Sequence, residues 1–554
     1  YLMHSKNIAP KLRSNLDTRS EEYLENKKIM LEKLDFIDDL LDQAELGGGA
    51  YHHERLAKRG KMPIRERVMN VIDDDTPFLE ISPFAGYGTD YTVGGGCVSG
   101  IGMISGVECV IFGNDPSVKA GAMTVYVGEK WRRAIEISRE NKIPFISFVE
   151  SAGGDLSMGT GSKSGQAPIS PTIQNTHFAA TGRFFYEMTE LSKLKIPVIS
   201  VVFGSSTAGG AYQPGMSDYN IFIKDQSQVF LAGPPLVKAA TGEESDAETL
   251  GGAKMHSEVS GLSDYLAEDE MDALRICREV VSHLNWKKIG DKPKKIPTAP
   301  VYDQEELLGL ISEDLKSPVD IREVIARFVD GSQFEEFKSL YGPTMICGWA
   351  SVHGYQVGIV GNNGPIYPEC AEKAASFVQL CNKRNIPLIF LQNVTGFLVG
   401  KDFERQAIIK KGSQLINSVS NSTVPHITII VGASYGAGTY AMSGRAYNNR
   451  FTFLWPTAKV AVMGPEQIAR VMSIVRKAKA KRTGEKFDEK VDAQIREMVE
   501  AAAERMSHGL VASSMLTDDG IIDPRDTRTI LGFCLSVVSN IPVEGASEYG
   551  VYRL

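Results

Sequence analysis

Two segments of this chain, 228 residues apart, share one sequence plan. Residues 195–219 read KIPVISVVFGSSTAGGAYQPGMSDY, and residues 423–440 read TVPHITIIVGASYGAGTY. Each has a proline, a β-branched apolar run, a glycine-rich break and a tyrosine. The spacing of 228 residues holds for three aligned pairs: Pro197 with Pro425, Gly204 with Gly432, and Tyr212 with Tyr440.

The similarity continues on both sides of these segments. Residues 141–153 match residues 384–396, and residues 229–234 match residues 460–465. Three blocks in the same order predict an internal duplication, which determines the architecture before any other feature does. The alternative is that two similar folds merely share turn chemistry, and the common order of the blocks argues against it.

The glycine-rich break after each apolar run is the first candidate site. The pattern predicts a buried strand, a glycine turn and the start of a helix. Amides at a helix N-terminus point toward negative charge, and glycine lets a ligand approach the backbone closely. We therefore expect Gly209 and Gly210 in the first copy, and Ala437 and Gly438 in the second, to donate to an oxyanion. Taken alone, such a sequence is often only a turn.

Length and charge narrow the class of protein. A chain of 554 residues is too long for one core, so two or more domains are expected. A net charge of −8 argues against nucleic-acid binding. No apolar run approaches the roughly 18 residues of a membrane-spanning helix. The seven cysteines form no CxxC pair and the nine histidines no HExxH pattern, so we expect free thiols, a reducing compartment and no metal site.

Strand-like and helical segments alternate in both halves, which predicts an α/β layered fold. An amphipathic helix is expected over 20–45. The expected strands are 95–104, 108–114, 143–149, 199–203, 354–362 and 386–391. The expected helices include 124–141, 182–194, 369–383 and a charged pair over 469–507. A Gly/Ser/Pro-rich loop is expected over 157–176.

A charged, proline-rich stretch over 287–300 is typical of a linker. It divides the chain into a domain of residues 1–295 and a domain of residues 296–554. A basic stretch begins at Arg55. It could contact phosphates, although a solvated helix face is the commoner explanation.

Common catalytic signatures are missing from the sequence, which has no Ser–His–Asp pattern, no GxSxG and no GxxxxGK[ST]. Backbone donors in two glycine turns suit a reaction that develops negative charge on a carbonyl oxygen, such as formation of a thioester enolate. Two such turns would serve a reaction with two enolate-like partners.

Several longer blocks resemble one family. The glycine turns, the two-half layout and residues 230–244, 250–264, 444–451 and 518–528 are similar to the carboxyltransferase (β) subunits of biotin-dependent acyl-CoA carboxylases. The methylcrotonyl-CoA and geranyl-CoA carboxylase branch resembles the chain more than propionyl-CoA carboxylase does. Residues 159–181 depart from the methylcrotonyl-CoA carboxylase pattern. Because this region borders the acyl pocket in the family, the acyl substrate stays open.

The resemblance implies two tandem, duplicated crotonase-like (ClpP/crotonase) domains of the β-β-α superhelix type. The N-terminal domain would bind acyl-CoA and the C-terminal domain biotin, with the active site between two subunits. Gly209 and Gly210 would hold the enolate oxygen, and Ala437 and Gly438 the ureido oxygen of biotin. The implied neighbours are Ala208, Ala211, Gly153 and Gly154 for the substrate and Gly436, Thr439 and Tyr440 for biotin.

The implied activity is carboxyl transfer from carboxybiotin to the α- or γ-carbon of an acyl-CoA resembling 3-methylcrotonyl-CoA, within a C–C bond-forming ligase complex. In the family, biotin itself takes the substrate proton, so no side-chain base is needed. The chain has no biotinyl-lysine motif (AMKM) and no ATP-binding glycine loop. It would therefore depend on a separate biotin carboxylase and biotin carrier (α) subunit. The family suggests a β6 core within an α6β6 complex, in the cytoplasm or the mitochondrial matrix.

Two other functions remain open from the sequence. A subunit of a biotin-dependent decarboxylase or transcarboxylase would run the same half-reaction in another direction. A non-catalytic acyl-CoA-binding scaffold would tolerate loss of one glycine turn, yet both turns are intact here.

Overall fold

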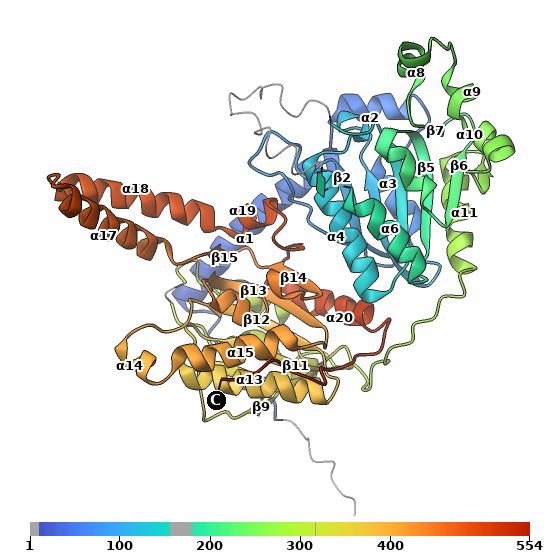
Figure 1. Cartoon of the computed structure of the whole chain (residues 1–554). Helices are drawn as coiled ribbons and strands as arrows, with labels where there is room; N and C mark the ends of the chain where they lie inside the picture. Colours follow the sequence, from blue (N-terminus) through green and yellow to red (C-terminus); the bar gives the residue numbers. More distant parts are fainter. Residues whose placement is uncertain (1–9, 156–178, 181, 316, 554) are drawn as a thin grey trace, which may run out of the picture. The chain divides into compact units, whose positions relative to one another are not determined.

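A computed structural model describes residues 10–155, 179–180, 182–315 and 317–553 (Figure 1). The chain forms two compact units. The N-terminal unit contains residues 37–289 and 514–516. The C-terminal unit contains residues 290–513 and 517–554 together with the described residues before 37. The boundary between the two therefore falls inside helix α1 (Glu21–Leu46).

The N-terminal unit is built on one eight-stranded sheet with the strand order β1-β2-β3-β4-β5-β6-β8, in which β7 also pairs with β5. Strands β1 to β3 pair antiparallel, and the pairs from β3 to β8 are parallel. The strands are β1 (Leu79–Glu80), β2 (Cys97–Ile104), β3 (Val107–Asn114), β4 (Phe145–Ser151), β5 (Val198–Thr207), β6 (Tyr219–Ile223), β7 (Gln228–Phe230) and β8 (Tyr265–Ala267).

The C-terminal unit repeats this sheet with the order β16-β14-β13-β12-β11-β10-β9, in which β15 also pairs with β13. The strands are β9 (Glu335–Phe337), β10 (Met345–Val352), β11 (Tyr355–Asn362), β12 (Leu388–Val394), β13 (His426–Tyr435), β14 (Phe451–Leu454), β15 (Lys459–Ala461) and β16 (Gly520–Ile521). In Figure 1 the strands of the first sheet are coloured from blue to green and those of the second from yellow to red.

The two sheets agree in register as well as in order. In β4 and β5, Phe145 pairs with Val198, and the register shifts before Ser151 pairs with Ser206. In β12 and β13, Leu388 pairs with His426, and the register shifts at the same place before Val394 pairs with Ser434. The duplication expected from the sequence is therefore confirmed down to one shared irregularity.

Helices cover the sheets of both units. Those of the N-terminal unit are α2 (Ala50–Ala57), α3 (Ile64–Val71), α4 (Val125–Asn141), α6 (Arg183–Lys193), α7 (Tyr212–Gly215), α8 (Pro234–Thr241), α9 (Ala247–Gly251), α10 (Ala253–Met255) and α11 (Glu270–Ser282). Those of the C-terminal unit include α12 (Ile321–Ala326), α13 (Pro368–Lys383), α14 (Lys401–Arg405), α15 (Ile408–Asn421), α16 (Gly438–Ala441), α17 (Pro465–Thr483), α18 (Glu489–Ser507), α19 (Gly509–Ser514) and α20 (Thr527–Val538).

Local signals explain several helix ends. Thr124 caps α4 by accepting a hydrogen bond from the Val127 amide at 3.2 Å, and the left-handed residue Lys142 follows the helix. Pro368 begins α13, where its missing amide costs no hydrogen bond. Each unit has its own apolar core, one centred on β3–β5 with α3 and α11, the other on β10–β12 with α13 and α15.

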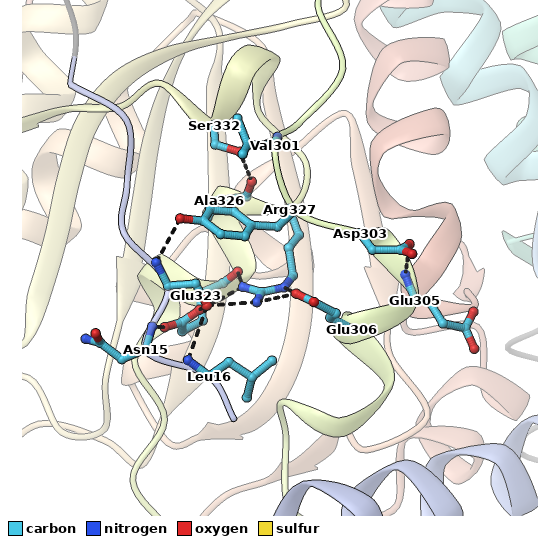
Figure 2. Close-up of polar contacts among 12 residues, drawn as sticks. Asn15, Leu16, Val301, Asp303, Glu305, Glu306, Glu323, Ala326, Arg327 and Ser332 are labelled. Carbon is cyan, nitrogen blue, oxygen red and sulfur yellow. Dashed lines mark hydrogen bonds and ion pairs between the residues drawn. The ribbon is translucent and has the colours of Figure 1, made fainter. Parts of the chain in front are cut away.

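A buried arginine attaches the N-terminal segment to the C-terminal unit (Figure 2). Arg327 pairs with Glu306 at 2.6 Å and with Glu323 at 2.7 Å. Glu323 also accepts hydrogen bonds from the Ser14 hydroxyl at 2.6 Å and from the Asn15 amide at 2.8 Å. Because these contacts satisfy buried charge, they explain why residues before 37 cluster with the second half of the chain.

Most predicted elements are present with shifts of a few residues at their ends. The helix over 20–45 is α1, and the charged pair over 469–507 is α17 and α18. Residues 287–300 form neither helix nor strand. Strand β10, which lies inside the second sheet, and helix α11, which packs on the first, were not predicted from the sequence. The loop expected over 157–176 lies outside the described residues.

Candidate active site

The first glycine turn lies at the carboxyl end of β5. Ala208, the first residue of the turn, has a left-handed φ of 52°, whereas Gly209 and Gly210 do not have positive φ. Gly209 is exposed and Gly210 is buried. A Cβ on Gly210 would lie 3.0 Å from the Ser206 hydroxyl oxygen and 3.4 Å from the Ser151 Cβ. Gly210 is therefore required by close packing against the ends of β4 and β5, and not by its backbone angle.

Gly153 and Gly154 follow β4 and lie beside the first turn. A Cβ on Gly153 would lie 3.6 Å from the Ala208 Cβ. Met123 donates its amide to the Gly153 carbonyl at 2.8 Å and accepts from the Asp155 amide at 3.1 Å. The amide of the intervening Gly154 points away from Met123 in this parallel bridge. No described atom lies within 4 Å of a Cβ built on Gly154, so there is room beside this amide.

Ala211 differs from the other predicted substrate-binding residues. Its methyl group packs into a buried apolar cluster with Val149 and Val202 of the neighbouring strands. Only its backbone faces the turn. Phe185 of α6 lies over the turn, with its ring edge 3.6 Å from a Cβ built on Gly209.

The second glycine turn repeats the first at the end of β13. Gly436 has a left-handed φ of 59°. The amides of Thr439 and Tyr440 are already bonded, to the carbonyls of Gly436 at 3.1 Å and Ala437 at 3.2 Å. The amides of Ala437 and Gly438 precede these two in the chain, at the start of α16. The first amides of a helix have no carbonyl acceptor within that helix. A Cβ on Gly438 would lie only 2.6 Å from Val394 Cγ2.

Buried polar groups hold the second turn in place. The Thr439 hydroxyl lies 2.9 Å from the Ser434 hydroxyl, which donates to the Gln392 side chain at 2.7 Å. Gln392 in turn donates to the carbonyl of Met442 at 2.9 Å. Tyr440 is half exposed and stacks on Tyr447 with ring centroids 5.8 Å apart. Thr439 thus positions the turn, whereas Tyr440 is free to contact a ligand.

The two turns differ in one neighbouring residue, which is Gly154 in the N-terminal unit and Phe397 in the C-terminal unit. In the N-terminal unit Met123 bridges to Gly154, and in the C-terminal unit Ile366 makes the equivalent bridge to Phe397. Phe397 helps to line an apolar pocket of about 320 Å³ that also borders Ala437. The other apolar walls of this pocket are Leu398, Val399, Ile408, Ile409 and Ile416.

A second pocket, of about 570 Å³, opens at the carboxyl ends of β4 and β5. Its lining includes Lys61 and Glu150, which form an ion pair. Burial lowers the pKa of Lys61, an effect that the nearby Glu150 carboxylate opposes. The basic stretch that begins at Arg55 is visible in the sequence, but the partner of Lys61 in this ion pair is 89 residues away, where no local pattern indicates it.

Both turns therefore present backbone amides at the carboxyl edge of a mainly parallel sheet, a usual location for ligand sites in α/β folds. Within the described residues, no group of three or more His, Cys, Asp or Glu side chains is placed to bind a metal ion. In that same part of the chain, every helix is too short or too polar to span a lipid bilayer. Each turn, within its own unit, has backbone amides at the start of a short helix.

Comparison with known proteins shows which family the chain belongs to. The family model described as "Carboxyl transferase domain" matches residues 55–546, and the chain therefore belongs to the carboxyl transferase family. A β2 subunit of a probable biotin-dependent acyl-coenzyme A carboxylase from Mycobacterium tuberculosis is 51% identical over 98% of this chain and 100% of its own. The mitochondrial methylcrotonoyl-CoA carboxylase β chain of Dictyostelium discoideum is 42% identical over 98% of this chain and 91% of its own.

A solved structure agrees with this placement. The β subunit of Pseudomonas aeruginosa geranyl-CoA carboxylase superimposes with a TM-score of 0.86 at 39% identity, covering 98% of this chain and 99% of that one. Within the family, the chain is a carboxyltransferase β subunit of the biotin-dependent acyl-CoA carboxylase type. The resemblance drawn from the sequence and the two crotonase-like domains are confirmed.

Proposed function

We propose that the turn of the N-terminal unit binds the thioester of an acyl-CoA and that the turn of the C-terminal unit binds biotin. In this proposal residues 1–295 supply the acyl-CoA side and residues 296–554 the biotin side. Gly209 and Gly210 hold the enolate oxygen of the substrate. Ala437 and Gly438 hold the ureido oxygen of biotin.

One observation carries the proposal: each turn begins with a left-handed residue, and the two residues that follow show the same alternation of exposure. Ala208 and Gly436 are both left-handed. Gly209 and Ala437 are both exposed, and the following glycine is buried in each copy. A reaction with two enolate-like partners needs two such oxyanion sites, and the duplication supplies them.

The surroundings of the turns support the division of roles. The apolar pocket beside Ala437 fits the mainly apolar ring system of biotin, with amide donors at its edge for one polar oxygen. No atom of the described residues lies within 4 Å of a Cβ built on Gly154, which supports placing the thioester beside Gly209. Phe397 occupies the equivalent place in the other unit.

When bound, biotin would supply the carboxyl group and accept the substrate proton. The residues of this chain would bind and orient. The amides of Gly209 and Gly210 would stabilise negative charge on the thioester oxygen as the acidic C–H bond breaks. Removing one such donor typically costs about 3 kcal/mol of transition-state stabilisation.

The substrate that we propose resembles 3-methylcrotonyl-CoA, and the partner is a biotin-carrying α subunit. The names of the relatives support a methylcrotonyl-type substrate. We further propose that the β subunits form a hexamer at the core of an α6β6 complex in the cytoplasm, with the active site shared between subunits. An active monomer in analytical ultracentrifugation would contradict the shared site.

A panel of thioesters tests the substrate. We expect the full chain, assayed with its biotin subunit, to carboxylate 3-methylcrotonyl-CoA with a higher kcat/KM than geranyl-CoA or propionyl-CoA. A preference for propionyl-CoA would contradict the substrate. Failure to carboxylate any thioester, with the partner shown to be carboxylated, would contradict the assigned roles of the two turns.

A further inference from the structure

The C-terminal strap, residues 541–553, crosses the helices α13 and α15 of the C-terminal unit and forms neither helix nor strand itself (Figure 1). It is fixed first at the end of α13. The amide of Gly545 donates to the side chain of Asn385, and the amide of Ala546 donates to that of Asn382, both at 2.9 Å. Asn382 is buried, so this end of the strap is tied to the interior of the helix layer.

The rest of the strap follows one face of α15. Its partners there are polar side chains spaced as on one side of a helix, Gln414, Asn417 and Ser418. The first two donate to backbone carbonyls of the strap, at 3.5 Å in the case of Asn417. The Ser418 hydroxyl lies 2.8 Å from the hydroxyl of Tyr552. The strap therefore holds α15 along more than one turn.

Two glycines let the strap lie this close to the helices. A Cβ on Gly545 would lie 1.6 Å from the carbonyl oxygen of Asn382, and a Cβ on Gly550 would lie 2.9 Å from the side-chain nitrogen of Asn417. A collision with a backbone carbonyl cannot be relieved by turning a side chain. Gly545 is therefore required for the seat of the strap on α13.

Another side of α15 lines the apolar pocket of about 320 Å³ that borders Ala437. The residues of the helix on this side are Ile408, Ile409, Gly412, Ser413 and Ile416. At 100° per residue, they lie roughly 150° around the helix axis from the side that the strap holds. The pocket wall and the strap thus meet different sides of one helix, so the strap constrains where the wall can lie.

The N-terminal unit contains the equivalent helix without such a strap. Helix α6 precedes β5 as α15 precedes β13, and the spacing of 228 residues also relates the last residues of the two helices, Lys193 and Asn421. The positions equivalent to the strap-facing residues Gln414, Asn417 and Asn421 are all exposed on α6, at Tyr186, Thr189 and Lys193. This type of helix layer therefore forms without a strap, and the strap serves a purpose particular to the C-terminal unit.

We propose that the C-terminal strap is a positioning element for α15 and sets how tightly the pocket beside Ala437 binds the ring system of biotin. The inference rests on the proposed role of the C-terminal unit in biotin binding. Val543 of the strap, Ile416 of α15 and Phe397 of the pocket pack against the same apolar core cluster. Displacing the strap therefore moves the pocket wall. Tyr552 acts through α15 and does not line the pocket, so it is a positioning residue.

Hydrogen–deuterium exchange in the full chain tests the hold on the helix. Tyr552→Ala removes the contact with Ser418, and Gly545→Ala displaces the strap without removing any of its contacts with α15. We expect the amides of residues 408–421 to exchange at least about tenfold faster in both variants, because opening of the helix becomes easier. Residues 183–193 of α6 serve as the internal reference and should not change.

Tyr341→Ala is the matched control for the exchange experiment. Tyr341 is an exposed tyrosine of the same unit whose hydroxyl donates to Glu372 of α13 at 2.6 Å, away from the strap. Exchange of α15 should stay at the wild-type rate in this control. Unchanged exchange in the two strap variants, or the same increase in the control, would overturn the strap.

Turnover tests the link between the strap and the pocket. In the reverse direction, the carboxyl group passes from the carboxylated CoA thioester to free biotin, which needs no partner subunit. We expect Tyr552→Ala to raise KM for biotin about fivefold or more and to leave KM for the CoA thioester unchanged. Tyr552→Phe, which keeps the ring and removes one hydrogen bond, should give a smaller rise. Faster exchange of α15 with an unchanged KM for biotin would overturn the link.

The two measurements distinguish failure of the strap from failure of the proposed function. If the wild type transferred no carboxyl group in either direction, the proposed function would fail and the exchange of α15 would decide the strap alone. If Tyr552→Ala did not fold, Tyr552→Phe would replace it, with an expected increase in exchange of about threefold. An equal rise in the KM values for biotin and for the thioester would overturn the proposal, because it would show a general defect.

Discussion

Ala208 and Gly436 have the same left-handed backbone conformation, with φ of 52° and 59°, at the first residue after β5 and β13. The left-handed conformation costs free energy for an alanine residue but not for a glycine residue. Since both adopt it, the conformation is imposed by the fold around the turn.

The first prediction concerns Gly210. In the Gly210→Val variant, the new side chain meets Ser206 and Ser151 and displaces the turn. We expect loss of carboxylation and of exchange of the acidic substrate C–H with solvent, by a factor of roughly 10²–10³ for one lost oxyanion donor. Circular dichroism should show a folded protein, because the change lies at a turn and not in the apolar β5 strand.

The matched control for this experiment is Gly215→Ala in the next helix, where the nearest atom to the new Cβ is 3.8 Å away. A folded Gly210→Val protein that carboxylates acyl-CoA at the parental rate would refute the oxyanion site of the N-terminal unit. Melting curves separate a local defect from unfolding.

The second prediction concerns Gly438. A Cβ added at Gly438 would point at Val394 and Gly396. Gly438→Ala should therefore overpack the turn, lower the melting temperature and reduce carboxyl transfer, at a cost of about 1–3 kcal/mol in stability. Binding of acyl-CoA should be unaffected, which titration can measure.

A second substitution distinguishes packing from other causes. Adding Val394→Ala removes the methyl group that lies 2.6 Å from the new Cβ. The double variant should regain part of the lost melting temperature and part of the transfer rate. Wild-type transfer by the single Gly438→Ala variant would show that this turn does not hold a reacting group.

The third prediction concerns the ion pairs of Glu150 with Lys61 and Arg67, beside the pocket of about 570 Å³ in the N-terminal unit. Glu150→Gln removes the carboxylate that pairs with Lys61 and with the fully buried Arg67. Removing one partner of a buried ion pair lowers the free energy of unfolding by about 3–5 kcal/mol. Denaturant unfolding should report this loss. Adding Lys61→Met removes the surplus cation, so the double variant should be less destabilised than Glu150→Gln alone.

Glu279→Gln is the control for this prediction, because Glu279 pairs with Arg275 in the open, where both side chains are more than half exposed. Such a surface pair contributes about 0–1 kcal/mol. If Glu150→Gln were no more destabilising than this control, the ion pairs of Glu150 would not stabilise the fold.

The fourth prediction concerns the pH dependence of stability. Burial raises the pKa of Asp518 to about 7, with a further contribution from the charge of Asp519. Between about pH 4 and pH 7 the folded state therefore retains a proton that the unfolded state has released. Stability from this group is present below the unfolded pKa of 3.8 and is lost as pH rises through 7.

Asp518→Asn removes this titration. The asparagine oxygen can still accept the hydrogen bonds from the Ser513 hydroxyl at 2.8 Å and the Gly520 amide at 3.0 Å. We expect the free energy of unfolding of the variant, relative to that of the wild type, to be higher at pH 8 than at pH 5. The change should be up to about 1.4 kcal/mol for each pH unit over which Asp518 titrates. An identical difference at both pH values would contradict the raised pKa.

Local patterns in the sequence were enough to predict both glycine turns and the strands before them. The apolar runs at 199–203 and 427–431 lie in buried parallel strands, and such runs are visible without knowledge of their partners. The edge strands β1, β8 and β9, only two or three residues long, were not predicted because so short a segment carries no periodicity.

By itself, the sequence determined that this chain is a duplicated α/β protein with two glycine turns, because repeats, strand patterns and glycine positions are local and persist whatever surrounds them. Only the tertiary structure joined Arg67 to Glu270 across 203 residues and Ser14 to Glu323 across 309. It also decided that, among the described residues, no atom lies within 4 Å of a Cβ built on Gly154, whereas the equivalent Phe397 lines a pocket. These relationships depend on which strands pair and how side chains share a small volume, and no single stretch of sequence contains that information.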